Sequence, residues 1–296
     1  MKGATLPDGS RIIIMQKAKE FIMHGLFLIC ACVSVLAVAL ICLYLFATGI
    51  PAMAEIGLTD FLFGQKWKPS SGYYGIFPMI IGSILVTGIA VAIGVPIGIL
   101  CAVFMSHYCP DKLYRFVKPA INLLAGIPSI VYGFFGLMVI VPIMKDIFGG
   151  SGKSLLTAGI LLGIMILPTV IKTTEASLNA VPKSYYEGAL ALGATHERSV
   201  FFASLPAAKS GILAAIILGV GRAIGETMAV ILVAGNQTIL PKSVTSGIRT
   251  MTSNIVIEMG YAGGLHRGAL IATGVVLFVL IFIINLCFSA LKRRKE

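Results

Sequence analysis

Charged side chains are scarce in this sequence, and their scarcity excludes an ordinary soluble domain. Asp, Glu, Lys and Arg make up 12% of the residues, whereas hydrophobic residues make up 57%. Five long intervals contain no charged residue at all: 21–54, 69–110, 119–144, 154–171 and 268–291. A helix needs about 20 apolar residues to cross the hydrocarbon core of a bilayer. We therefore expect a protein that crosses a lipid bilayer several times.

Other absences exclude other classes of protein. Apolar and polar residues do not alternate with a period of two, which excludes a transmembrane β-barrel. The segment GGSGKS at 149–154 lacks the first glycine of a phosphate-binding loop, because that position is Ile147. We interpret it as a flexible outer turn. No H-E-x-x-H helix or nucleophile elbow is present, so we expect no metal, no cofactor and no catalytic residue.

The apolar runs predict six membrane-spanning helices with both termini in the cytoplasm. The spans are expected near 21–46, 75–105, 119–144, 155–176, 207–234 and 267–290. With the N-terminus inside, 15 of the 23 Lys and Arg residues fall on the inner side, which is the positive-inside distribution. The net charge of +11 therefore follows from topology and does not indicate nucleic-acid binding.

These spans divide the chain into four parts. The parts are a cytoplasmic N-terminal segment (1–20), a first helix with an outer segment (21–74), a transmembrane domain (75–290) that contains an inner loop (177–206), and a cytoplasmic tail (291–296). In the outer segment, Trp67, Tyr73 and Tyr74 suit a membrane-interface belt. Small residues four apart allow close helix contact. They occur as Gly94/Gly98, Gly159/Gly163 and Gly221/Gly225.

Two charged residues interrupt the fifth span. Arg222 and Glu226 are four apart, which would place them on one helix face. Each charge at membrane depth costs about 2.5–3.5 kcal/mol on insertion scales. Two interpretations remain open: an ion pair that holds helices together, or a charged site on a transport path. Arg249, Glu258 and Arg267 fall in the last outer loop, where we expect solvated groups or contacts to a binding protein.

The inner loop carries signals for two short helices. Pro182 prevents the preceding helix from continuing. Ser184 and Glu187 fit a capping box at the start of a new helix. Gly193 can end that helix in the left-handed conformation after about two turns. Thr195 can cap a second short helix, and Pro206 can open the fifth span.

A two-turn helix is marginal in water unless its apolar side chains are covered. Four such side chains are expected to be exposed: Tyr185, Tyr186, Leu190 and Leu192. The loop therefore either docks on a partner or lies on the membrane or on its own bundle.

The stretch EGALALGATHERSVFFASLP (187–206) resembles the EAA loop of ABC importer permeases. It departs from the family pattern at Gly188 and Ala203. In that family the loop forms a coupling helix that fits a groove of the ATPase subunit. The resemblance therefore implies that ATPase coupling uses Ser184, Tyr185, Tyr186, Glu187, Ala189, Leu190, Gly193, Leu205 and Pro206.

Most of residues 61–290 look like the phosphate ABC importer permeases. The similar segments include LLAGIPSIVYGFFGL, GVGRAIGETMAVILVAGN and GLHRGALIATGVVLF, and Phe61-x-x-Gly64-x-x-Trp67-x-Pro69 is similar to the PstC-type subunit. The resemblance implies an all-α membrane bundle of the type I ABC importer (MetI-like) class, with six transmembrane helices and a cytoplasmic coupling helix. It implies location in the bacterial inner membrane.

The same resemblance implies a substrate and a set of partners. Arg222 would attract inorganic phosphate in the translocation path, and Glu226 would hold the arginine and partly neutralise it. The partners would be a second permease subunit (PstA-type), two ATPase subunits (PstB-type), a phosphate-binding protein (PstS-type) and the lipid bilayer. Sulfate or molybdate remains an alternative substrate, and a secondary transporter driven by an ion gradient remains an alternative class.

Overall fold

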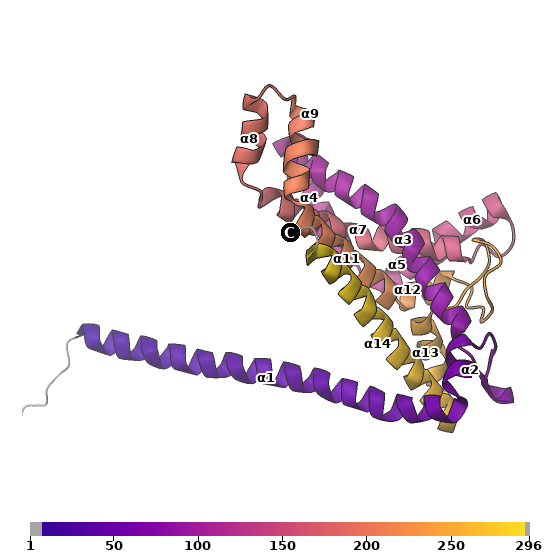
Figure 1. Cartoon of the computed structure of the whole chain (residues 1–296). Helices are drawn as coiled ribbons and strands as arrows, with labels where there is room; N and C mark the ends of the chain where they lie inside the picture. The colour runs from indigo at the N-terminus through magenta and orange to yellow at the C-terminus, as the bar shows by residue number, and fades with distance from the viewer. Residues whose placement is uncertain (1–7, 294–296) are drawn as a thin grey trace, which may run out of the picture. The chain divides into compact units, whose positions relative to one another are not determined.

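The computed structural model describes residues 8–293, with side chains from residue 19 to residue 290, and the fold is helical (Figure 1). The first elements are α1 (Asp8–Ile56), α2 (Leu58–Phe63), β1 (Trp67–Lys68), a 3₁₀ turn (Pro69–Ser71), β2 (Tyr73–Tyr74), α3 (Phe77–Val103), a π-helical turn (Phe104–Tyr108), α4 (Asp111–Gly126), α5 (Ser129–Phe135), a second π-helical turn (Gly136–Ile140), α6 (Val141–Phe148) and α7 (Leu155–Asn179). They are followed by α8 (Lys183–Ala191), α9 (His196–Ser199), a third π-helical turn (Val200–Ser204), α10 (Leu205–Ala207), α11 (Lys209–Gly225), α12 (Met228–Val233), α13 (Met251–Met259) and α14 (Gly264–Arg293).

The chain divides into two compact units, residues 1–48 and 49–296. The described part of the first unit is the N-terminal portion of α1. The second unit contains every later element. Within it, Figure 1 places α8 and α9 at one end, and α2 and α13 at the other end. The predicted terminal segments 1–20 and 291–296 lie partly outside the described residues, which exclude 1–7 and 294–296.

The predicted helical membrane fold is confirmed. In the described part of the chain, five helices are long and apolar enough to cross a membrane, and a bent pair brings the number to six if it forms one span. The five are Lys19–Ile56, Phe77–Tyr108, Ser129–Phe148, Leu155–Asn179 and Gly264–Ala290, and the bent pair is His196–Ala207 with Lys209–Gly225.

The third span begins later than the sequence predicted. The helix expected at 119–144 is interrupted at Ile127, whose ψ of 127° is extended. Pro128 explains the interruption, because a proline disfavours the helical conformation of the residue before it. The amphipathic helix α4 is therefore a separate element, and the apolar helical stretch runs over Ser129–Phe148.

The fifth span is bent and broken where the sequence predicted one continuous helix. Its two parts meet at an angle of 69° around Ala208, and α11 ends at Gly225. Pro206 was expected to open the span, but it lies inside the helical stretch 196–207 and precedes the bend. The prediction failed because proline is also accepted in the first turn of a new helical segment, here α10.

The main helix interface of the second unit is between α3 and α7, and glycines allow these two helices to approach closely. A Cβ at Gly94 would lie 2.6 Å from the Gly163 carbonyl oxygen, and a Cβ at Gly159 would lie 2.4 Å from Ile89 Cγ2. Two of the predicted small-residue pairs, Gly94/Gly98 and Gly159/Gly163, therefore lie at a close helix–helix contact. The third pair does not, since a Cβ at Gly221 or Gly225 would meet no atom within 4 Å.

The GGSGKS segment forms a turn that leads into α7. Gly149, Gly150 and Gly152 adopt φ values of 74°, 71° and 70°, which side chains with a Cβ rarely adopt. Ser154 is the N-cap of α7, and its Oγ accepts a hydrogen bond from the Thr157 amide at 3.2 Å. The geometry is that of a turn and a helix start, as the sequence predicted.

Candidate translocation site and coupling loop

The break in the fifth span separates Arg222 from Glu226. Arg222 lies in the last turn of α11, whereas Glu226 follows the helix with an extended backbone (φ −70°, ψ 133°). The prediction that both residues share one helix face is therefore wrong. Gly225 lowers the helix propensity at this point. The carboxylate of Glu226 accepts a hydrogen bond at the start of the next helix, α12, and does not extend the face of α11.

Each of the two side chains has its own partner. The Arg222 guanidinium donates from Nη1 to Thr169 Oγ1 on α7 at 3.3 Å. Glu226 Oε1 accepts from the Ala229 amide at 3.2 Å and so satisfies a free amide in the first turn of α12. Among the described residues no ion pair joins Arg222 to Glu226. Both side chains are half-buried.

The backbone of the break is also satisfied. The Glu226 amide donates to the Ala223 carbonyl at 3.3 Å, and the Glu226 carbonyl accepts from Thr252 Oγ1 at 3.1 Å. Thr252 lies in the first turn of α13. The interruption is therefore a defined structure with internal partners, and it follows directly after the turn of α11 that carries the half-buried Arg222.

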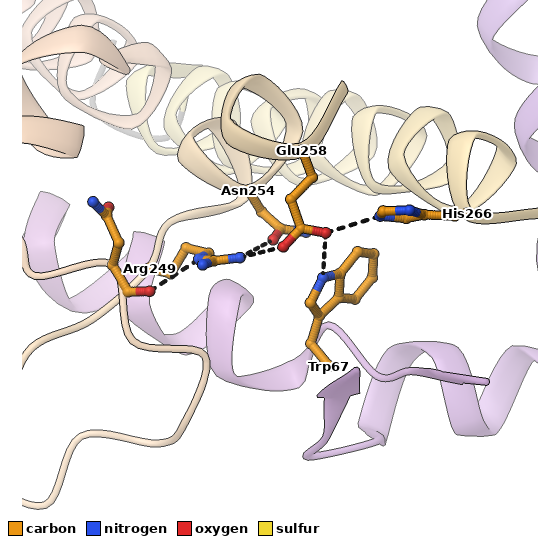
Figure 2. A network of polar contacts seen from close by, with 6 residues as sticks. Trp67, Arg249, Asn254, Glu258 and His266 are labelled. Atoms are coloured by element: carbon orange, nitrogen blue, oxygen red, sulfur yellow. Dashed lines mark hydrogen bonds and ion pairs between the residues drawn. The ribbon is translucent and has the colours of Figure 1, made fainter. Parts of the chain in front are cut away.

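A second polar cluster surrounds a buried carboxylate near the other end of α13 (Figure 2). Glu258 is 6% exposed, and its Oε1 pairs with Arg249 Nη1 at 2.6 Å. Its Oε2 accepts from Trp67 Nε1 at 2.9 Å and lies 2.8 Å from His266 Nε2. Arg249 also donates to the Asn254 side chain at 3.0 Å. We call these five residues the Glu258 cluster.

The Glu258 cluster corrects two expectations from the sequence. Arg249 and Glu258 were expected as solvated groups or contacts to a binding protein, but they form a largely buried ion pair. Trp67 was expected in an interface belt, but it is 7% exposed and its indole N–H is bonded to Glu258. The sequence could not predict this arrangement because Trp67 and Glu258 are 191 residues apart.

Arg267, the third charged residue of the predicted last outer loop, has an exposed side chain.

A third cluster joins α4 to α7, and the sequence analysis did not anticipate it. Glu175 on α7 is 4% exposed, and Lys118 Nζ approaches its carboxylate to 2.9 Å. The Tyr114 hydroxyl also donates to Glu175. Hydrogen bonds to Tyr114 and then to Glu175 raise the pKa of Lys118 above its ordinary value. The available signal was the spacing of Tyr114 and Lys118, which are four residues apart and share a helix face.

The inner loop forms the two short helices that the sequence predicted. Helix α8 runs over nine residues, Lys183–Ala191, and Gly193 follows it with φ 86°. The Ala194 amide donates to the Ala189 carbonyl at 3.1 Å, which closes the end of the helix. Thr195 caps α9 by accepting from the Arg198 amide at 3.4 Å.

Two details of the loop differ from the prediction. The capping box at Ser184 and Glu187 is absent, because α8 begins at Lys183 with Pro182 in the capping position. Tyr186 does not face outward, since its hydroxyl lies 2.6 Å from His196 Nδ1 and its ring packs against a cluster with Val200.

The remaining loop residues separate into an exposed group and a covered group. Ala189 and Leu205 are half-buried. The exposed side chains form the surface that a partner could contact: Ser184, Tyr185, Glu187, Leu190, Leu192 and Pro206.

The structure has three features of a membrane permease. They are several membrane-spanning helices, a span broken beside a half-buried arginine, and an exposed loop of two short helices. The sequence profile of the family described as binding-protein-dependent transport system inner membrane component matches residues 94–296. The chain belongs to this family.

Curated relatives cover most of the chain. It is 36% identical over 274 residues to a protein of Bacillus subtilis named probable ABC transporter permease protein YqgH, covering 90% of this chain and 89% of the relative. It is 36% identical over 241 residues to the phosphate transport system permease protein PstC of Haemophilus influenzae, covering 75% of this chain and 76% of the relative.

Solved structures share the fold. The inward-facing MetNI methionine ABC transporter matches with a TM-score of 0.63 at 21% identity, covering 78% of this chain and 100% of that chain. A bacterial ABC transporter involved in the import of alginate matches with a TM-score of 0.59 at 15% identity, covering 95% and 98%. These neighbours define the fold as that of an ABC importer permease.

Proposed function

We propose that this chain is a permease subunit of an ATP-driven importer that moves inorganic phosphate across the bacterial inner membrane. The observation that carries the proposal is the half-buried Arg222, whose side chain has Thr169 as its hydrogen-bond partner within the described residues. Relatives named PstC, which are phosphate transport system permeases, support the choice of substrate.

The chemistry of Arg222 suits a phosphate ion. A guanidinium presents several N–H donors in a planar fork that matches two phosphate oxygens. A half-buried cation without a counter-ion carries part of the cost of burying a charge, and an anion that enters the path lowers that cost. Because the Glu226 carboxylate caps α12, it does not neutralise Arg222 in this conformation. A closer approach of Glu226 in another state would weaken phosphate binding and favour release.

The subunit works with partners in this proposal. They are a second permease subunit of the PstA type, two ATPase subunits of the PstB type and a phosphate-binding protein of the PstS type. ATP-driven closure of the ATPase subunits moves the loop around Glu187, and the helices then expose the path to each side in turn. The positive-inside distribution of Lys and Arg supports a cytoplasmic location for both chain termini.

Uptake of radiolabelled phosphate by the complex reconstituted in vesicles tests the proposal. Arg222→Ala should abolish uptake and Arg222→Lys should retain little, because an ammonium lacks the fork. Arg115→Ala is the matched control, since Arg115 lies on α4 with an exposed side chain. The three variants should assemble equally with the ATPase. Full uptake by Arg222→Ala would refute the role of this residue.

Two further arms test the substrate and the energy source. Excess sulfate or molybdate should leave phosphate uptake unchanged, and strong competition by either would indicate another oxyanion as the substrate. Uptake should persist with ATP when ion gradients are collapsed. Loss of uptake under that condition would indicate a secondary transporter.

A further inference from the structure

The short helix α12 is held at both ends by one later segment of the chain. At its start, the Glu226 carbonyl accepts from Thr252 Oγ1 at 3.1 Å. Beyond its end, the Asn236 carbonyl accepts from Arg249 Nε at 3.1 Å. A helix of six residues is not stable alone, so the place of α12 depends on such contacts.

Helix α13, which carries Thr252, is itself fixed at two points. At its first residue the Met251 amide donates to Ser83 Oγ on α3 at 3.0 Å. Near its last residue, Glu258 receives donors from three separate parts of the chain: Arg249 at 2.6 Å, Trp67 at 2.9 Å and His266 at 2.8 Å (Figure 2). A largely buried carboxylate with these partners resists displacement, because loss of one donor leaves a charge incompletely compensated.

We propose that Thr252 and Glu258 are positioning residues for the transport step. The contacts of Glu258 hold α13 in position. Thr252 on α13 in turn holds the carbonyl of Glu226 through its hydrogen bond. The extended backbone at Glu226 then determines the position of the last turn of α11, which carries Arg222. The β1–β2 hairpin contributes through Trp67. A displacement of this hairpin therefore changes the place of the break in the fifth span. The inference rests on the proposed function, since it assigns these residues to the path that contains Arg222.

The test compares isosteric variants in the complex reconstituted with its ATPase and binding protein. Thr252→Val removes the hydroxyl bond to Glu226 together with the 3.1 Å hydrogen bond between Thr252 Oγ1 and Thr250 Oγ1, and Thr252→Ser retains both. Thr273→Val is the matched control, because Thr273 is also buried but bonds the Ala269 carbonyl of its own helix. Loss of one hydrogen bond corresponds to a change of about fivefold in a rate or an equilibrium.

The phosphate transported per ATP hydrolysed should therefore fall about fivefold in Thr252→Val, while Thr252→Ser and Thr273→Val stay near wild type. Trp67→Phe, which removes one donor to Glu258, should change the ratio in the same direction. A merely structural defect would lower complex yield and leave the ratio unchanged. An unchanged ratio in Thr252→Val would overturn the proposal.

Hydrogen exchange separates this inference from the proposed function. The amides of α12 should exchange faster in Thr252→Val than in Thr273→Val, whether or not phosphate is the substrate. If the wild-type complex moves no phosphate while α12 is loosened in this way, the proposed function fails and the positioning contact stands. Equal exchange in the two variants would refute the positioning contact itself.

Discussion

The interface of α3 with α7 gives a sharp test of the fold, because two glycines on one helix have opposite surroundings. A Cβ at Gly94 would lie 2.6 Å from the Gly163 carbonyl oxygen and 2.7 Å from Ile166 Cγ1. A Cβ at Gly88, on the same helix, would meet nothing within 4 Å. Gly94→Ala should therefore force the helices apart, whereas Gly88→Ala should not.

The magnitude follows from the contacts. The first obstacle at Gly94 is backbone, so α7 must move by about 0.5 Å or more, and overpacking of this kind costs about 1–3 kcal/mol. Replacing glycine by alanine within a helix raises the stability by up to about 1 kcal/mol through helix propensity, but this gain is the same in both variants. The difference between them should thus be about 2 kcal/mol, which corresponds to roughly 4–8 °C in Tm for a chain of this size.

Thermal unfolding of the purified chain in detergent, followed by loss of the monodisperse peak, measures this difference. Gly94→Ala should unfold at the lower temperature and Gly88→Ala at or slightly above that of the wild type. Equal Tm values would mean that α3 and α7 do not approach closely at Gly94, and the packing argument would be refuted.

Two further predictions concern the ends of helices. Gly193→Ala should cost about 1–2 kcal/mol in the inner loop (177–206) because φ is 86° there, whereas Gly188→Ala should be tolerated. Binding of the ATPase subunit to vesicles should weaken about tenfold for the first variant only, and equal binding would contradict the conformational argument. Ser154→Ala should lower the stability of the chain by about 1 kcal/mol through loss of the α7 cap to Thr157, and an unchanged Tm in detergent would contradict this.

Local signals in the sequence predicted local structure well. Gly193 ends α8 with a positive φ and Thr195 caps α9, because both effects depend on residues within a few positions. The charge-free intervals predicted most of the membrane helices, because about 20 consecutive apolar residues suffice for a helix to cross the bilayer. The capping box at Ser184 failed because Pro182 took the capping position, and two local signals in competition cannot be ranked from spacing alone.

Interactions between distant segments could not be predicted from the sequence. Glu258 looked like a solvated group because its partner Trp67 lies 191 residues away. Arg222 and Glu226 looked like a pair because helical periodicity assumes an unbroken helix, and the sequence gives no strong signal for the break. Gly225 and the β-branched Thr227 weaken the helix, and the carbonyl of Glu226 at the break is bonded by Thr252, which lies 26 residues later in the chain.

The break itself bears on which interpretation of Arg222 is preferred. Irregular backbone at membrane depth is tolerated only when its polar groups are satisfied or line a cavity. At Glu226 the amide, the carbonyl and the carboxylate all have partners within the protein. The backbone therefore does not need Arg222 for its stability. Within the described residues the guanidinium bonds to a neutral hydroxyl and forms no ion pair with a carboxylate, which supports the proposed role of Arg222 in binding an anion.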